Sequence, residues 1–132
     1  MKFIEADSAS EVDLANWPWV NFKPSEFACK STGKLKIAIP LVNALQTMRR
    51  EINKPFMVVS GYRSPEHNAK VGGAKHSKHM EGTAVDISMV GHDPHLFERV
   101  ARRAGFLGFG FYPENNFMHI DLGPKREWGT RW

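Results

Sequence analysis

The sequence has one cysteine, no long hydrophobic run and no long run of like charge, and each absence excludes a class of protein. The single thiol, Cys29, cannot form an internal disulfide or build a cysteine-based structural zinc site. No apolar stretch approaches the roughly 18 residues that a membrane-spanning helix requires, so we expect no membrane insertion. The chain turns acidic at Glu5 and lacks the apolar segment and cleavage site of a signal peptide, which favours synthesis in the cytoplasm without export.

The remaining composition is that of a globular protein. Hydrophobic residues make up 42% and charged residues 24%, and the length of 132 residues predicts a single domain over 1–132. A monomer is the favoured oligomeric state. The net charge of +4 favours an anionic partner, but no helix interleaves basic and aromatic residues, so we expect no nucleic acid. Trp17, Trp19 and Trp128 are expected to pack the termini onto the domain, with stacking on a sugar ring as the alternative.

Hydrophobic periodicity predicts an α+β domain. Apolar residues spaced by four, three and four predict a helix from Pro40 to Ile52, and an Asp93-Pro94 start with Gly105 at the end predicts a second. Strands are predicted over 56–60, 83–89, 109–112 and 117–122, with a long loop over 61–82. This order favours a small, mostly antiparallel sheet with helices packed on one face.

Polar and apolar side chains alternate on two of the predicted strands. Asp86 lies between Val85 and Ile87, and His119 alternates with apolar neighbours in the same way. A carboxylate on an inner strand is costly unless it is paired or binds a metal. With His79 closing over them from the end of the loop, the three side chains suit a catalytic zinc site with three protein ligands. The alternative is that each is a hydrogen-bonded core or loop residue, which is the commoner role for any single histidine.

Three stretches together resemble the M15 family of zinc peptidases. They are Ser60-Gly61-Tyr62-Arg63-Ser64, Ser77-x-His79-x-x-Gly82-x-Ala84-x-Asp86 and Phe117-Met118-His119-Ile120-Asp121. The family comprises D-alanyl-D-alanine carboxypeptidase-like enzymes that are related in fold to the hedgehog signalling domain. The short M15A or M15_3 type is the most similar, and the resemblance covers about residues 21–128. It therefore implies a hedgehog-like or DD-peptidase-like fold for nearly the whole chain.

The resemblance implies a zinc metallopeptidase that acts on peptidoglycan stem peptides, as a carboxypeptidase or a cross-link endopeptidase. It implies that His79, Asp86 and His119 bind Zn²⁺, and that Arg63 steadies the substrate carboxylate or the developing oxyanion. Without a signal peptide, such an enzyme is expected to reach the cell wall when released by lysis or carried on a virion, as a phage or prophage endolysin. Action on recycled muropeptides in the cytoplasm is the alternative.

One departure from the family leaves the proton shuttle open. Many relatives carry an acidic residue three positions before the third metal ligand, where this chain has Asn116. Glu114 is our predicted shuttle, and Asp121 is the alternative, although Asp121 can instead orient His119. A chain without an effective base would be a catalytically weak, zinc-containing peptidoglycan-binding module, which is the second hypothesis.

Overall fold

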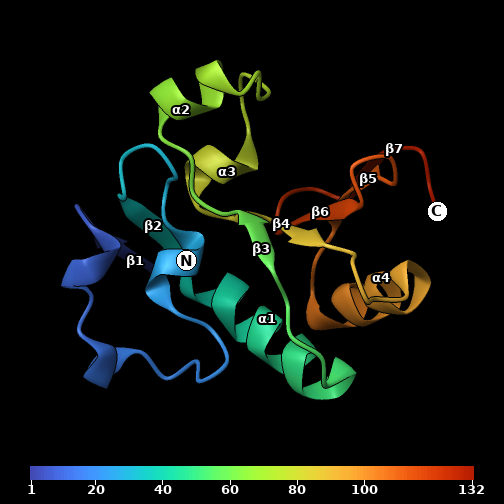
Figure 1. Ribbon diagram of the computed structural model, residues 1–132, viewed down its shortest axis with the longest axis horizontal. Helices are drawn as coiled ribbons and strands as arrows, with labels where there is room; N and C mark the ends of the chain where they lie inside the picture. Colours follow the sequence, from blue (N-terminus) through green and yellow to red (C-terminus); the bar gives the residue numbers. More distant parts are fainter.

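A five-stranded sheet in the order β3-β4-β6-β5-β7 forms the centre of the computed structural model, which describes residues 1–132 (Figure 1). The strands are β3 (Val58–Ser60), β4 (Ala84–Ser88), β5 (Gly108–Tyr112), β6 (Phe117–Asp121) and β7 (Arg126–Gly129). All neighbours in the sheet are antiparallel except β5 and β7, which are parallel. The prediction of an α+β fold with a mostly antiparallel sheet is confirmed.

The two long helices pack against one face of this sheet. Helix α1 (Ile39–Ile52) ends at Asn53 in the left-handed conformation, with φ of 56°. Helix α4 (Pro94–Ala104) begins at Asp93, whose carboxylate accepts hydrogen bonds from two backbone N–H groups of the first turn. The apolar residues of both helices share one core with alternate residues of β4, β5 and β6. The opposite side chains of those strands therefore form a second, more polar face. None of the helices has the length and hydropathy that crossing a membrane requires.

Two short helices lie on the other side of the sheet from α1 and α4 (Figure 1). They are α2 (Pro65–Lys70) and α3 (Lys78–Glu81), and both fall within the stretch predicted as a loop. Each is capped by a serine, because Ser64 and Ser77 accept a hydrogen bond from the first-turn backbone of their helix. His79 therefore lies on a helix and not at the end of a loop. Ser64-Pro65-Glu66 is a helix-start pattern, so one helical turn could be expected there, and α2 begins at that place. Helix α3 has four residues, which are too few to show a hydrophobic period, and the sequence did not reveal it.

The N-terminal part of the chain adds a separate two-stranded sheet that was not predicted. Strands β1 (Phe3–Ala6) and β2 (Leu35–Ala38) pair antiparallel, and three 3₁₀ helices lie between them. The helices are η1 (Ala9–Glu11), η2 (Leu14–Asn16) and η3 (Pro24–Phe27), the last with a proline at its first position. Trp17 and Trp19 are buried in an edge-to-face pair, so these two tryptophans pack the terminus onto the domain as expected.

Candidate metal centre

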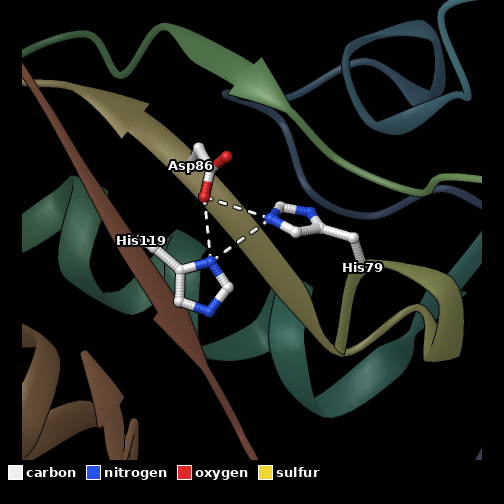
Figure 2. A group of neighbouring side chains, drawn as sticks. All are labelled: His79, Asp86 and His119. Atoms are coloured by element: carbon white, nitrogen blue, oxygen red, sulfur yellow. Dashed lines mark hydrogen bonds and ion pairs between the residues drawn. The ribbon is translucent and has the colours of Figure 1, made fainter. Parts of the chain in front are cut away.

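His79, Asp86 and His119 converge on the polar face of the sheet (Figure 2). Asp86 on β4 and His119 on β6 are directly opposite each other in the strand register, and His79 reaches them from α3. Asp86 Oδ1 lies 3.1 Å from His79 Nε2 and 2.9 Å from His119 Nδ1, and the two nitrogens are 3.2 Å apart. Ligand atoms about 2.0–2.2 Å from a tetrahedral zinc ion are roughly 3.3–3.6 Å from one another. The observed separations lie just below this range, so the three buried donors fit one small cation.

The two histidines present opposite ring nitrogens to the cluster, and a hydrogen bond fixes each choice. His79 Nδ1 donates to the backbone carbonyl of Gly61 at 2.7 Å, which leaves Nε2 facing the cluster. His119 Nε2 donates to Asp121 Oδ2 at 2.6 Å, which leaves Nδ1 facing it. An imidazole whose proton is held on one nitrogen offers the lone pair of the other to a metal. Both rings are therefore oriented as metal ligands.

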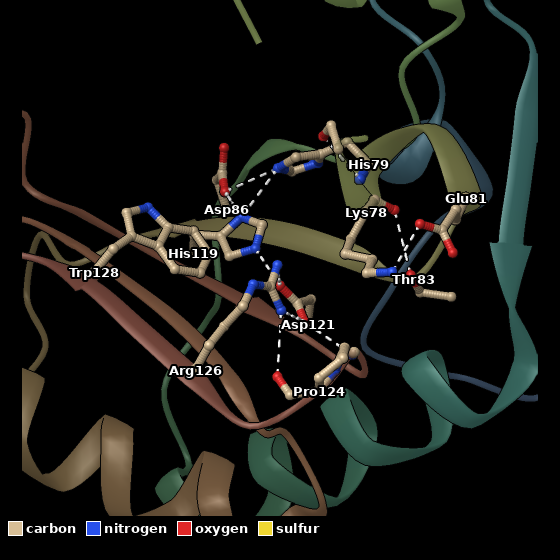
Figure 3. Close-up of polar contacts among 12 residues, drawn as sticks. Lys78, His79, Glu81, Thr83, Asp86, His119, Asp121, Pro124, Arg126 and Trp128 are labelled. Atoms are coloured by element: carbon tan, nitrogen blue, oxygen red, sulfur yellow. Dashed lines mark hydrogen bonds and ion pairs between the residues drawn. The ribbon is translucent and has the colours of Figure 1, made fainter. Parts of the chain in front are cut away.

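Asp121 lies behind His119, away from the cluster (Figure 3). Its carboxylate has no solvent exposure and accepts hydrogen bonds from His119, from the backbone of Gly123 and from two nitrogens of Arg126, at 2.9 and 3.0 Å. Burial raises the pKa of Asp121, but the hydrogen bonds from His119 and Arg126 outweigh it and hold that pKa below its usual range. This geometry is that of a carboxylate that orients His119, which is the second of the two roles considered for Asp121.

The charges within the cluster are coupled. Burial alone would raise the pKa of Asp86, but hydrogen bonds from His119 and His79 bring it far below its usual range. Burial would likewise lower the pKa of His119, yet its hydrogen bonds to Asp121 and Asp86 raise it. The two carboxylates beside His119 thus favour its protonated form. A bound cation would take the place of the proton on His119 Nδ1.

Arg63 reaches the same cluster from the segment that follows β3. Its guanidinium donates to Ser60 Oγ at 3.2 Å, to Asn68 Oδ1 at 3.3 Å and to Asp86 Oδ2 at 3.4 Å. The oxygen of Asp86 that faces Arg63 is the one that does not face the histidines. Arg63 therefore lies beside the metal donors and holds one of them in position. The substrate-binding role that the resemblance implies for it stays a prediction.

A pocket of about 280 Å³ opens above these residues. Arg63, the two histidines and Asp86 line it together with two walls, one from the α2–α3 segment and one from the strands. The wall residues are Val71, Gly72, Gly73, Ala74 and Ser77 on one side and Tyr112, Phe117 and Trp128 on the other. A Cβ atom at Gly73 would collide with the side-chain oxygen of Asn68, so a larger residue there would displace the asparagine that holds Arg63. Trp128, unlike Trp17 and Trp19, borders this pocket.

Glu114 is not brought into the pocket. It is exposed in the turn between β5 and β6, over 113–116, and borders a neighbouring hollow together with Pro113 and Thr130. Asn116 closes the same turn with φ of 53°. The structure therefore unites the three predicted metal ligands with Arg63 but leaves the predicted shuttle at the rim, where its role stays a prediction.

The family model described as Peptidase M15 matches residues 20–121, which include all three candidate metal ligands. The chain belongs to the peptidase M15 family. Its M15 relatives include peptidoglycan L,D-endopeptidase MepK of Escherichia coli strain K12, 42% identical over 82 residues, or 57% of this chain and 44% of that protein. Zinc D-Ala-D-Ala carboxypeptidase of Streptomyces albus G is 36% identical over 125 residues, or 84% of this chain and 49% of that protein. The chain thus spans about half the length of the curated relatives that it matches.

Some residues at the metal centre were not predicted from the sequence. They lie after residue 121, where the M15 match ends, or between the three stretches that carry the family resemblance. Arg126 comes from β7 and Tyr112 from β5. Trp128, also on β7, was expected to pack a terminus or to stack on a sugar ring, and its contact with His119 was not foreseen. One signal could have found them: the Gly108-x-Gly110-x-Tyr112 alternation leaves one face of a strand without side chains. A Cβ atom at Gly110 would lie 2.6 Å from the Trp128 ring, and one at Gly108 would collide with the Asp121 carboxylate. The glycines make room for residues that support and border the M15 metal centre.

Proposed function

We propose that this chain is a zinc-dependent peptidase that hydrolyses amide bonds in peptidoglycan stem peptides, as a carboxypeptidase or a cross-link endopeptidase. The observation that carries the proposal is the cluster of His79, Asp86 and His119 at the base of an open pocket, in a chain of the M15 family. The relatives named as a peptidoglycan L,D-endopeptidase and a zinc D-Ala-D-Ala carboxypeptidase support both the metal and the substrate class.

The donor set supports zinc in particular. Two imidazole nitrogens and one carboxylate oxygen, with no cysteine, are typical of catalytic zinc sites. Zinc held there supplies Lewis-acid activation of water and of the scissile carbonyl. The protein contributes the orientation of its ligands. The carbonyl of Gly61 fixes the ring of His79, and the carboxylate of Asp121 fixes the ring of His119. Arg63 holds the carboxylate of Asp86.

Arg63 is also the cation that would receive the peptide. A guanidinium has five N–H groups, and three nitrogens here donate to Ser60, Asn68 and Asp86, which leaves two N–H groups for a ligand. A carboxylate or carbonyl oxygen of a stem peptide is the complementary acceptor. Because the guanidinium is already held on three sides, little side-chain freedom is lost when substrate binds. Glu114 stays the predicted proton shuttle for the leaving amine, which requires the 113–116 turn to approach the pocket when peptide is bound.

One observation favours a second candidate, a catalytically weak zinc-containing module that binds peptidoglycan. Among the residues that line the pocket, Asp86 alone is acidic, and it is committed to the metal cluster. Such a module would hold zinc and peptide without efficient proton transfer to the leaving amine. The two candidates differ in turnover and not in binding.

The test is turnover by the purified, zinc-loaded chain on purified peptidoglycan, with released fragments identified by mass spectrometry. Release of stem-peptide fragments or free amino acids supports the peptidase, and the fragment masses identify the bond. His79→Ala and His119→Ala should abolish both the binding of zinc and the release of peptide fragments. His95→Ala, at an exposed position on α4, is the matched control and should change neither zinc binding nor fragment release. Retention on peptidoglycan without any released product over a range of pH would favour the binding module.

A further inference from the structure

We propose that the Tyr112 hydroxyl is a substrate-binding group of this centre: it donates a hydrogen bond to the carbonyl oxygen of the bond to be cleaved, and Trp128 holds it in place. The inference rests on the proposed peptidase function and names a residue for it that lies on the wall opposite the α2–α3 segment.

The tyrosine is fixed by the sheet beside the metal donors. Tyr112 is the last residue of β5 and is paired with Phe117 of β6, two residues before His119. The Tyr112 and Phe117 rings are stacked, with centroids 4.5 Å apart and an angle of 11° between their planes. Both side chains line the pocket together with His119. The ring is thus held against a strand, so its hydroxyl has a defined position at the pocket wall.

Trp128 connects the hydroxyl to the metal centre. Its indole Nε1 donates to the Tyr112 hydroxyl at 2.6 Å, and its ring lies 4.9 Å from the ring of His119. The Arg126 guanidinium lies 4.9 Å from the same indole while it pairs with Asp121. Trp128 therefore contacts the ligand ring, the cation that supports it and the tyrosine, which leaves the indole little freedom to move.

The hydroxyl proton of Tyr112 has no acceptor within the protein. An indole N–H can only donate, so the Tyr112 oxygen is the acceptor in this pair. The hydroxyl makes no other hydrogen bond within the protein, and its own proton therefore has no protein acceptor. Because the side chain lines the pocket, the free O–H is available to an acceptor bound there. In a peptide, the strong acceptor at the reacting centre is the carbonyl oxygen.

A donor at this place has a clear chemical use. The carbonyl oxygen gains negative charge as the amide is attacked, and a fixed donor aimed at it stabilises that charge. The O–H bond of Tyr112 stays intact in this role, so no proton leaves the residue. Arg63 spends three of its five N–H groups on the protein, and no acidic side chain other than Asp86 lines the pocket. A neutral donor on the other wall complements that arginine.

The test compares Tyr112→Phe with Tyr62→Phe, the only other tyrosine, which lies in a separate hollow with Glu5 and Lys36. Each zinc-loaded full-length variant is assayed for zinc content, for kcat and KM on peptidoglycan fragments, and for its Kd with a phosphinate analogue of D-alanyl-D-alanine. We expect Tyr112→Phe to keep its zinc and to lose about 10²–10³-fold in kcat, as for other oxyanion donors. Its Kd for the phosphinate should rise by about tenfold or more. Tyr62→Phe should behave as the unmutated protein does.

A second variant covers the case in which Tyr112→Phe fails to fold. Trp128→Phe keeps an aromatic ring beside His119 but removes the indole N–H that holds the hydroxyl, so we expect a loss of about 2–10-fold in kcat. The inference is overturned if Tyr112→Phe, or Trp128→Phe when Tyr112→Phe does not fold, keeps kcat and the phosphinate Kd within about twofold of the unmutated values. A different result, no released fragments and no phosphinate binding by the unmutated zinc-loaded protein, would overturn the proposed function together with the inference.

Discussion

Asp121 Oδ2 lies 2.6 Å from His119 Nε2, and the carboxylate that makes this contact has no solvent exposure. The two residues are next but one along β6, so the strand places both on the polar face and brings the carboxylate to the back of the ring. Arg126 neutralises the carboxylate from the far side. Ligand, orienting carboxylate and cation thus form one chain of contacts that leads away from the pocket.

We expect Asp121→Asn to weaken zinc binding by about 10–100-fold, because an amide holds the His119 N–H less strongly and makes the ring a poorer ligand. Competition with a chelator of known affinity measures the change. Asp7→Asn is the control, because Asp7 is exposed and its side chain makes no hydrogen bond within the protein. This variant should leave the zinc affinity unchanged. Equal zinc affinity in Asp121→Asn and the unmutated chain would contradict the orienting role.

Zinc uptake should release a proton, and the affinity should fall as the pH falls. The pKa of His119 in the metal-free protein is raised, so at a pH below that value a second proton occupies the ring, on Nδ1, and zinc must displace it. Above that value the ring is neutral and no proton is displaced. Because the pKa is raised, the fall in affinity begins at a higher pH than for an ordinary histidine at about 6.5. Titration calorimetry at a pH of about 6, below the raised pKa of His119, in buffers of different ionisation enthalpy counts the protons, and a heat that is independent of the buffer at that pH would contradict the prediction.

Arg63→Lys should reduce kcat/KM by about 10²-fold, although the positive charge is kept. Lysine cannot reach Ser60, Asn68 and Asp86 at the same time and still present a flat pair of donors to substrate. Arg50→Lys, on the exposed side of α1, is the matched control. Near-normal kinetics of Arg63→Lys would remove this arginine from the site.

Glu114→Gln tests the predicted proton shuttle. A positioned acid–base group contributes about 10²–10⁴-fold, so turnover should drop by that order while the zinc content stays intact. Glu11→Gln is an exposed control far along the chain. Since Glu114 lies outside the pocket, turnover within about twofold of normal would show that the proton passes to the leaving amine without this residue.

Much of the centre could be predicted because strand alternation and helix periodicity are local properties of a sequence. Asp86 and His119 were placed on one face by their apolar neighbours, and the pairing of β4 with β6 then set them opposite each other. Helices α1 and α4 were found from their spacing and caps. The single domain, the monomeric state and the expected route to the cell wall stay predictions.

The elements that escaped prediction depend on contacts between distant residues. Strands β1 and β2 have four residues each and are stabilised by pairing across about thirty intervening positions, which no local pattern reports. Strand β7 has little apolar alternation, and Trp128 on it is ordered by Tyr112 and His119. Glu114 was placed near the metal by counting along the chain, whereas the tight turn at 113–116 leaves it on the surface.

The parallel strand β7 also affects where this domain can be shortened. A version trimmed to residue 121, where the family match ends, would keep His79, Asp86 and His119, so all three motifs of the family would still be present. It would nevertheless lack the guanidinium that neutralises a fully buried carboxylate and the indole that shields one side of a ligand ring. Anyone grafting or fusing this domain should therefore treat the eleven residues after Asp121 as part of the candidate metal centre and place a tag or linker beyond Trp132.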